Sequence, residues 1–524
     1  MANFSDIICA PATVPGTGAI SVVRVSGEGC IPLADKVIKL RKGDLASSKG
    51  YTLHYGSITL GDGVLLDEVV VSLFRAPHSY TGEDSLEISC HASKYIVGEI
   101  LRLLLEQGCR MARPGEFTQR AFLAGKMDLA QAEAVADVIA STSEASHRVA
   151  ISQMKGGFSA ELASMRSELL HLVTLMELEL DFSEEEVEFA DRSELRGLLD
   201  KTLSHIGSLM ESFKLGNALR NGVPTAIVGA TNAGKSTLLN ALLGEDRAIV
   251  SPIDGTTRDT IEETLNIDGV LFRFIDTAGL RDAADTVERI GIERSYKKLG
   301  EASIVLAMLD GGKSEEEIRE SLHGILGRGN LAEQKLIVLL NKIDGLSGEE
   351  VRNKIVTLQN IIVSYADCSV VTCDSEPSSE IGAGEPQNTS SKSEINILAI
   401  SAKTGNGIEE LKKTLADSQK DLIEDAASQT LVTNLRHYES LRSAQGSLKS
   451  VEEGLSAGVP TDLLCQDIRE AIDALGEIVG VISSQEVLNN VFANFSEGVA
   501  ISICDITRKF SMQKYTYFFA AQTQ

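Results

Sequence analysis

The stretch Gly229-Ala230-Thr231-Asn232-Ala233-Gly234-Lys235-Ser236 decides the fold of the centre of this chain, because it fits the pattern G-x-x-x-x-G-K-[ST]. It follows the strand-like run 225–228 and precedes the helical pattern 237–242. A strand, a glycine-rich turn and a helix in this order predict a P-loop, whose backbone N–H groups converge on phosphate oxygens. Lys235 then supplies a cation for the β- and γ-phosphates, and Ser236 supplies a hydroxyl ligand for Mg²⁺.

Two further motifs are typical of loops that sense a γ-phosphate. The sequence Asp276-Thr277-Ala278-Gly279 ends an apolar strand-like run. Asp276 can hold Mg²⁺ through water, and the N–H of Gly279 can contact the γ-phosphate. Between this motif and the P-loop lies Thr256-Thr257, and Thr257 can complete the Mg²⁺ shell when triphosphate is bound.

Base recognition is predicted from two motifs that follow later strands, Asn341-Lys342-Ile343-Asp344 and Ser401-Ala402-Lys403. The carboxylate of Asp344 can accept hydrogen bonds from the N1–H and N2–H₂ edge of guanine, whereas adenine has no such pair of donors. The second motif can offer a backbone N–H to guanine O6. Strand-like and helical runs alternate over residues 223–416, which implies βαβ units and a parallel sheet. Together these patterns predict a Ras-like GTPase domain.

The residues that drive hydrolysis are less evident from the motifs. In Ras-like GTPases a Gln directly after the D-x-x-G motif orients the attacking water, but this position is Leu280 here. Glu288 can orient the water indirectly, or it is an ordinary charge on a surface helix. The side-chain carbonyl of Asn232 can coordinate a monovalent cation, or the residue simply caps a turn.

Composition limits the class of protein. Of 524 residues, 43% are hydrophobic and 24% charged, and the net charge is −26, which argues against a general basic surface for nucleic acid. No apolar run reaches the ~18–20 residues of a membrane span, and the N-terminus lacks a secretory signal, so we expect a cytoplasmic protein. The eight cysteines do not form a disulfide framework and are expected to be reduced and to bind no metal. Cys368 and Cys373 lie five residues apart, but no second Cys or His pair completes a zinc site.

Changes in periodicity predict a multidomain α/β + α protein, in which a helical domain is interrupted by the P-loop domain. The acidic run Glu184-Glu185-Glu186 is interpreted as a solvated face. The predicted parts are an α+β domain (1–120), the first helical half (121–215), the G domain (216–417) with a flexible insertion (374–394), the second helical half (418–495) and an atypical tail (496–524).

Several motifs outside the G domain resemble the MnmE (TrmE) family of tRNA-modification GTPases over roughly residues 3–495. The motifs that carry the resemblance are Val22-Val23-Arg24-Val25-Ser26-Gly27, Tyr80-Thr81-Gly82-Glu83-Asp84, Arg113-Pro114-Gly115-Glu116-Phe117, Met127-Asp128-Leu129-Ala130-Gln131-Ala132-Glu133-Ala134, the stretch from Ile249 to Asp259, and Ala474-Leu475-Gly476-Glu477-Ile478-Val479-Gly480.

The resemblance implies a homodimer formed through the N-terminal domain, and G domains that meet on GTP binding with K⁺ as activator. Carried over by motif, K⁺ is held by Asn232 and the 251–256 loop (Ser251, Ile253, Thr256), and Mg²⁺ by Ser236 and Thr257. The catalytic residues are then Glu288, Lys235 and Thr257. The full set assigned to GTP is Asn232, Ala233, Gly234, Lys235, Ser236, Thr237, Ser251, Thr256, Thr257, Asp276, Thr277, Ala278, Gly279, Asn341, Lys342, Asp344, Ser401, Ala402 and Lys403.

The resemblance also implies the reaction and its partners. With the flavin-dependent partner MnmG, the family adds a carboxymethylaminomethyl or aminomethyl group at C5 of the wobble uridine of certain tRNAs. A formyl-tetrahydrofolate donor, such as 5-formyl-tetrahydrofolate, binds between the N-terminal domains. By position, its contacts are Arg24, Glu87 and Lys126. The cations suit the folate carboxylates, and the Glu suits pterin N–H donors.

The sequence departs from the family at its end. The family normally ends in Cys-x-Gly-Lys after a Phe, but Phe495 is followed here by Ser496-Glu497-Gly498-Val499. Two alternatives to full tRNA-modification activity stay open. One is a family member impaired in modification by its altered C-terminus, and the other is a GTP-regulated RNA-binding switch of the ribosome-assembly type.

Overall fold

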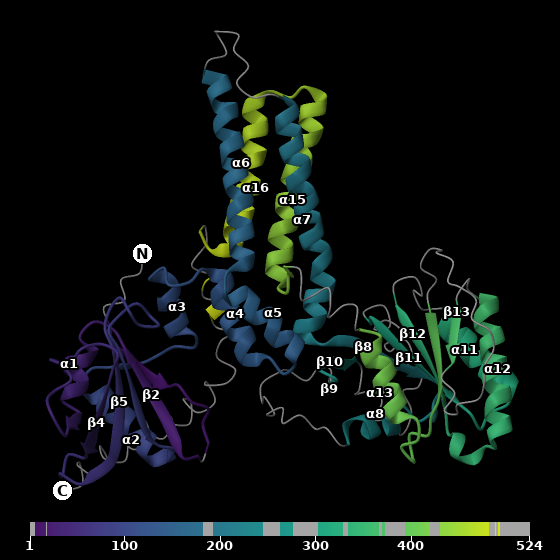
Figure 1. The fold of residues 1–524 in the computed structure, drawn as a ribbon, viewed down its shortest axis with the longest axis horizontal. Coiled ribbons are helices and arrows are strands. Elements are labelled where there is room, and N and C mark those ends of the chain that lie inside the picture. Colours follow the sequence, from purple (N-terminus) through teal and green to yellow (C-terminus); the bar gives the residue numbers. More distant parts are fainter. Residues whose placement is uncertain are drawn as a thin grey trace, which may run out of the picture. The chain divides into compact units, whose positions relative to one another are not determined.

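The computed structural model describes residues 6–16, 18–181, 192–244, 263–275, 302–327, 334–365, 369–372, 394–419, 430–481, 488 and 491–492. The chain divides into two compact units (Figure 1). Unit 1 comprises Met1–Ala136, Gln153–Leu199 and Gly446–Gln524, and unit 2 comprises Asp137–Ser152 and Asp200–Gln445. Both contain sheet and helix, as predicted for a mixed α/β and α protein. None of the helices in the described ranges has the length and apolar character needed to cross a membrane.

Unit 1 begins with a seven-stranded sheet among its described residues, in the order β3-β4-β5-β6-β2-β1-β7. Neighbouring strands are antiparallel except for β1 and β7, which are parallel. The strands are β1 (Ile8–Pro11), β2 (Ile20–Ser26), β3 (Ile38–Leu40), β4 (Thr52–Thr59), β5 (Leu65–Phe74), β6 (Ser85–His91) and β7 (Arg110–Met111).

Alternation along the strands separates the two faces of this sheet. In β5, Val69, Val71 and Leu73 are buried and pack with α1 (Cys30–Asp35) and α2 (Lys94–Glu106). On the opposite face, which we call the outer face, large apolar side chains are exposed to solvent. Period-two burial therefore places one face in the core and leaves the other available.

The helices of unit 1 join segments from both ends of the chain. Its helices include α3 (Glu116–Leu123), most of α4 (Leu129–Ala140), α6 (Gly157–Asp181) and α16 (Thr461–Val479). α6 and α16 lie side by side (Figure 1), and Arg166 Nε donates to the carbonyl of Ile472 at 3.3 Å. Gly476 leaves space for Arg166, because an added Cβ would lie 3.4 Å from its Nε. Gly480 ends α16 with φ +79°, and its Cβ would lie 2.9 Å from Phe122. Both glycines belong to the motif 474–480.

Unit 2 contains a second sheet, which has seven strands among the described residues in the order β13-β14-β12-β11-β8-β10-β9. Only β9 is antiparallel to its neighbour. The strands are β8 (Val223–Gly229), β9 (Glu263–Ile267), β10 (Val270–Ile275), β11 (Ile304–Asp310), β12 (Lys335–Asn341), β13 (Ser369–Thr372) and β14 (Glu394–Ala399). The predicted parallel sheet is confirmed. Residues 374–393 of the predicted insertion lie outside the described ranges, and Glu394 is the first residue of β14.

Helices cover both faces of the second sheet. The core on one face includes α8 (Lys235–Leu243) and α13 (Ile408–Asp417), and the core on the other includes α11 (Glu315–Leu326) and α12 (Gly348–Tyr365). This doubly wound arrangement brings the carboxyl ends of β8, β11 and β12 to one edge, where such folds bind ligands.

Helical segments also pack within unit 2. Phe213 of α7 (Arg192–Asn221) stacks on Tyr438 of α15 (Leu435–Ala457) with ring centroids 4.7 Å apart. The β9–β10 hairpin contacts the residues before α5 (Glu144–Met154), because Asn266 Nδ2 of β9 donates to the carbonyl of Thr142 at 2.9 Å. The short helical segment 137–152 therefore belongs with the α/β sheet in this unit.

Candidate functional site

The P-loop connects the end of β8 to the start of α8. Asn232 and Gly234 both adopt left-handed backbone conformations, with φ +65° and +103°. Lys235 Nζ donates to the carbonyls of Gly229 (2.8 Å) and Ala230 (3.0 Å), so the ammonium lies across the loop. Burial lowers the pKa of Lys235. A phosphate beside this ammonium would favour its charged form, which is the interaction that a P-loop lysine provides.

The two glycines of the loop are required by close backbone packing. A Cβ on Gly229 would lie 2.3 Å from the carbonyl oxygen of Met308 in β11. A Cβ on Gly234 would lie 2.3 Å from Asn341 Nδ2. No side chain fits at either distance, so the glycines allow the loop to lie directly against β11 and the end of β12.

The side chain of Asn341 joins the P-loop to the second base-recognition motif. Its Nδ2 donates to the carbonyl of Ala233 at 2.7 Å, and its Oδ1 accepts from the N–H of Ala402 at 2.9 Å. The residue is only 2% exposed. Three segments that are far apart in the sequence are thus held together by one buried carboxamide.

Asp344 lies where a guanine-reading carboxylate is expected. Ser401 Oγ donates to Asp344 Oδ1 at 2.7 Å and accepts from the N–H of Thr404 at 3.3 Å. The hydrogen bond from Ser401 holds the pKa of Asp344 below its usual value. The group is therefore an ionised acceptor at neutral pH and can take two hydrogen bonds from a guanine edge.

A second candidate site lies on the sheet of unit 1. Arg24 of β2 and Glu87 of β6 are directly opposite in the strand register, and Arg24 Nε donates to Glu87 Oε1 at 2.9 Å. The Arg24 guanidinium also lies over the rings of Tyr80 (5.3 Å) and Phe117 (5.6 Å). The Lys126 side chain lies beside another part of this region, because a Cβ added to Gly82 would lie 3.5 Å from its Cε. The structure thus joins Arg24 and Glu87 directly and places Lys126 against the neighbouring loop.

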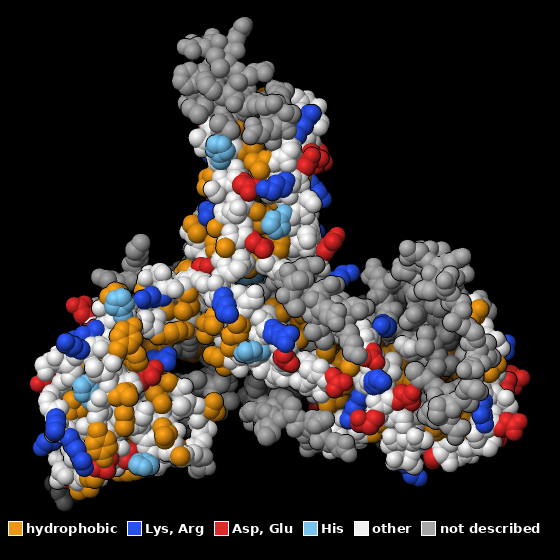
Figure 2. Space-filling view, in the orientation of Figure 1, with side chains coloured by type: hydrophobic (Ala, Val, Ile, Leu, Met, Phe, Trp, Pro, Cys, Tyr) orange, Lys and Arg blue, Asp and Glu red, His pale blue; other side chains and the backbone are white. Residues whose placement is uncertain are grey.

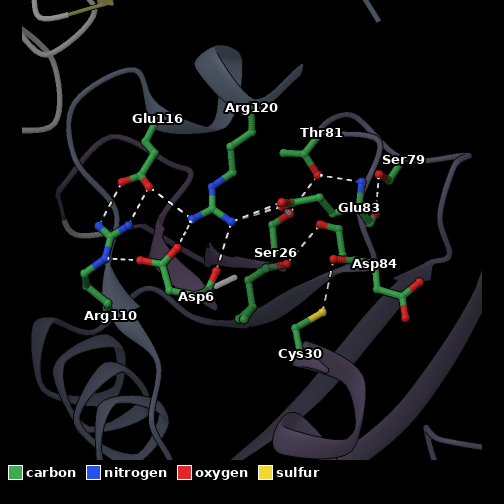
Figure 3. A network of polar contacts seen from close by, with 12 residues as sticks. Asp6, Ser26, Cys30, Ser79, Thr81, Glu83, Asp84, Arg110, Glu116 and Arg120 are labelled. Atoms are coloured by element: carbon green, nitrogen blue, oxygen red, sulfur yellow. Dashed lines mark hydrogen bonds and ion pairs between the residues drawn. The ribbon is translucent and has the colours of Figure 1, made fainter. Parts of the chain in front are cut away.

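An ion-pair network with a buried centre holds the two segments that carry these aromatic rings (Figure 3). Arg120 is 1% exposed and pairs with Asp6, Glu83 and Glu116, while Arg110 pairs with Asp6 and Glu116. Ser26 and Thr81 extend the network through Glu83. Glu83 follows Tyr80 by three residues and Glu116 precedes Phe117, so the network anchors both rings.

Comparisons with known proteins match almost the whole chain. The family model described as "GTP-binding protein TrmE N-terminus" matches residues 7–126, and the model described as "MnmE helical domain" matches residues 129–495. A protein named tRNA modification GTPase MnmE from Bacteroides thetaiotaomicron is 48% identical over 495 residues, which cover 94% of this chain and 99% of the relative. The protein of the same name from Flavobacterium johnsoniae is 46% identical over 500 residues, with coverage of 94% and 99%.

The chain belongs to the MnmE family. Membership confirms the resemblance seen in the motifs, and with the P-loop described above it makes this MnmE-family protein a GTP hydrolase.

Not every predicted site residue of this MnmE-family protein can be placed. Those that lie outside the described residues are Ser251, Ile253, Thr256, Thr257, Asp276, Thr277, Ala278, Gly279 and Glu288. Of the others, Asn232, Thr237 and Lys403 are exposed, whereas Asn341, Ser401 and Ala402 are buried. The roles of all these residues remain predictions, to which we return under the proposed function.

Tyr80 and Phe117 were not predicted as site residues. Both occur in motifs that carry the family resemblance, but only the folded structure shows that both rings lie within reach of the Arg24 guanidinium. The signal in the sequence that could have indicated these two site residues is an aromatic residue within a charged motif.

Gly234→Ala should weaken GTP binding about a hundredfold. The new Cβ displaces Asn341, and the alanine must adopt a φ of +103°, which is strained for a residue with a side chain. The strain and the lost hydrogen bond together cost roughly 2–3 kcal/mol, which corresponds to a hundredfold loss of affinity. Titration with a fluorescent GTP analogue measures the effect. Gly324→Ala in α11 is the matched control, because nothing lies within 4 Å of its Cβ position. Equal affinity of the two variants would contradict this account of the loop.

Acid should loosen the network around Glu116. Burial alone would raise the pKa of Glu116, but hydrogen bonds from Arg110, the Arg113 N–H and Arg120 outweigh it and lower the pKa below the usual 4.5. A carboxylate with a lowered folded pKa stabilises the fold above its unfolded pKa, and this contribution is lost as the pH falls below about 4.5 and through the folded value.

Hydrogen–deuterium exchange of α3 tests this, since the chain contains no Trp to report its unfolding. Corrected for intrinsic rates, protection should fall below pH 4.5 in the unmodified chain. Glu116→Gln should already show about tenfold lower protection at pH 7 and a flatter profile, because buried partners lose their anion. The exposed Glu28→Gln is the control. A profile for Glu116→Gln that matches this control would refute the role of the carboxylate.

Proposed function

We propose that this protein is a K⁺-activated GTPase that acts with an MnmG-type flavin-dependent partner on tRNA. The reaction adds a carboxymethylaminomethyl or aminomethyl group at C5 of the wobble uridine, with a formyl-tetrahydrofolate as one-carbon donor. GTP hydrolysis drives dimerisation of the G domains and a conformational change. The observation that carries the proposal is the presence of both sites, the Asn341–Asp344 pocket and the Arg24–Glu87 pair, in one chain of this family.

The chemistry of the Arg24 region fits a folate. Arg24 is a planar cation over two aromatic rings, which suits a flat, polar heterocycle or a carboxylate. Glu87 is an acceptor for pterin N–H groups, and its side chain is 29% exposed, so it can be reached. Lys126 lies beside the 80–84 loop and can pair with a carboxylate of the glutamate tail. A bound folate would supply the one-carbon unit, and these residues would bind and orient it.

The outer face of the N-terminal sheet supports a homodimer. Leu53, Tyr55 and Val70 are 72%, 41% and 39% exposed on this face. The cross-strand register runs from Leu53 through Ser72 and Glu87 to Arg24, so the apolar surface continues into the candidate folate site. Figure 2 shows hydrophobic side chains gathered over the surface of this domain. Pairing of two such faces would remove apolar area from water and bring two folate sites to one interface.

The described half of the nucleotide site supports the proposed ion chemistry. Asn232 is exposed at the tip of the P-loop, so its carboxamide oxygen is accessible to a K⁺ ion shared with the 251–256 loop. Ser236 lies in the first turn of α8, where a hydroxyl can meet Mg²⁺, with Thr257 as its proposed second ligand. K⁺ would supply positive charge where charge develops between the β- and γ-phosphates. Glu288 replaces the missing Gln as the residue that orients the attacking water.

The rate of GTP hydrolysis should depend on the alkali metal. Turnover in KCl should exceed turnover in NaCl at equal ionic strength, and Glu288→Ala should lower kcat about a hundredfold or more with nearly unchanged nucleotide affinity, the pattern of an interaction made in the transition state. The exposed Glu315→Ala in α11 serves as a control variant. Identical turnover in both salts would remove the cation from the mechanism, and a fully active Glu288→Ala would remove its assigned role.

The Arg24 site should be needed for tRNA modification but not for GTP turnover. Glu87→Gln and Arg24→Gln should weaken binding of 5-formyl-tetrahydrofolate at least about tenfold, because each removes a charged hydrogen-bond partner. Arg102→Gln is the control, since Arg102 pairs with Glu99 and Glu106 on α2. Calorimetry measures binding, and mass spectrometry of tRNA nucleosides from a complemented deletion strain measures modification.

The outcomes separate the alternatives. Unmodified tRNA with intact folate binding and GTP turnover would indicate a member that is impaired in modification. Absence of folate binding in the unmodified protein would contradict the proposed donor.

A further inference from the structure

Asp310 connects the end of β11 to the guanine-recognition motif. It is the last residue of β11 and lies directly opposite Asn341, the last residue of β12. Because the two parallel strands end together, the Asp310 carboxylate reaches the next residue of the motif. Its Oδ2 lies 2.7 Å from Lys342 Nζ.

Backbone contacts fix both sides of this ion pair. Asp310 Oδ1 accepts from the N–H of Gly312 at 2.9 Å, so the carboxylate cannot turn freely. The N–H of Gly311 donates to the carbonyl of Asn341 at 2.7 Å, and a Cβ on Gly311 would lie 2.8 Å from that oxygen. The loop after β11 is therefore held in register with the start of the motif.

A second lysine holds the same loop from α12. Lys354 Nζ donates to the carbonyls of Gly311 and Lys313, each at 2.6 Å. This contact fixes the loop independently of Asp310. The Asp310 carboxylate is held by the Gly312 N–H and contacts the Lys342 ammonium, so it is placed to orient this cation.

We propose that Asp310 is a positioning residue for guanine nucleotides, which acts by holding the Lys342 side chain in place. Asp344 is placed to read the edge of the base, and Lys342, two residues earlier with a left-handed backbone, is placed to cover its face with an alkyl stem. A lysine stem has four rotatable bonds, and the Lys342 side chain is 43% exposed. Ordering it in advance reduces the entropy lost when nucleotide binds.

The affinity for nucleotides and the preference for one base should depend on different residues of this site. Lys342 covers the ring without reading its hydrogen-bonding groups, so Asp310 should set how tightly nucleotides bind but not which base is preferred. Asp344 should do the reverse, since an Asn there can donate to the C2 carbonyl of xanthine where guanine has an amino group.

The test uses the full-length chain and measures binding of GDP and xanthosine diphosphate by competition titration. Asp310→Asn should weaken GDP binding about fivefold to tenfold with its base preference unchanged, the size expected for losing one charged, partly exposed contact. Asp344→Asn should shift the preference toward xanthosine diphosphate. In a Lys342→Ala background, Asp310→Asn should have no further effect. Glu144→Gln, which breaks the exposed Arg148–Glu144 pair of α5, should leave binding unchanged.

Three results would overturn the proposal. They are unchanged GDP affinity in Asp310→Asn, a change in its base preference, or a full additional loss in the Lys342→Ala background. If Asp310→Asn fails to fold by circular dichroism, Lys354→Gln decides the matter. It loosens the same loop and should weaken GDP binding in the same direction only when Lys342 is present.

Discussion

The arrangement of the P-loop and the loops beside it depends on one buried neutral side chain. The Asn341 carboxamide donates with one end and accepts with the other, and both partners are backbone groups of loops that would otherwise be independent. An Asp at this position would direct an oxygen toward the Ala233 carbonyl, and a Leu would leave both buried backbone groups without this partner. Because Gly234 lies within contact of the same amide, the P-loop, the end of β12 and the 401–402 turn keep one geometry.

In the N-terminal domain, ion pairs hold separate segments of the chain together. Arg110 and Arg120 share the carboxylates of Asp6 and Glu116, and the central Arg120 and Glu116 are almost completely buried. Charges in such a site are tolerated only when each has a partner, so loss of one member destabilises the rest. Glu83 and Glu116 belong to family motifs and resemble ligand-binding residues in the sequence. In the fold they anchor the segments that carry Tyr80 and Phe117, while Arg24 and Glu87 remain accessible.

Local patterns predicted much of the fold and part of the site. The expected strand 225–228 falls within β8, because an apolar run before a glycine-rich motif is determined locally. The Asn341–Ala233 contact spans 108 residues and the Arg24–Glu87 pair spans 63. Such contacts depend on strand order and register, which one sequence does not contain. The resemblance supplied Arg24 and Glu87, but neither motif nor resemblance indicated the Asp310–Lys342 pair or the aromatic rings beside Arg24.

The β9–β10 hairpin joins the sheet of unit 2 to the residues ahead of α5. In the sequence Thr257 precedes β9 and Asp276 follows β10, and Asn266 of β9 donates to the carbonyl of Thr142 ahead of α5. β10 pairs with β8 in a parallel ladder, which fixes the register of the hairpin on the sheet. One hydrogen-bonded path therefore runs from the strand that carries the P-loop, through the hairpin, to the residues ahead of α5.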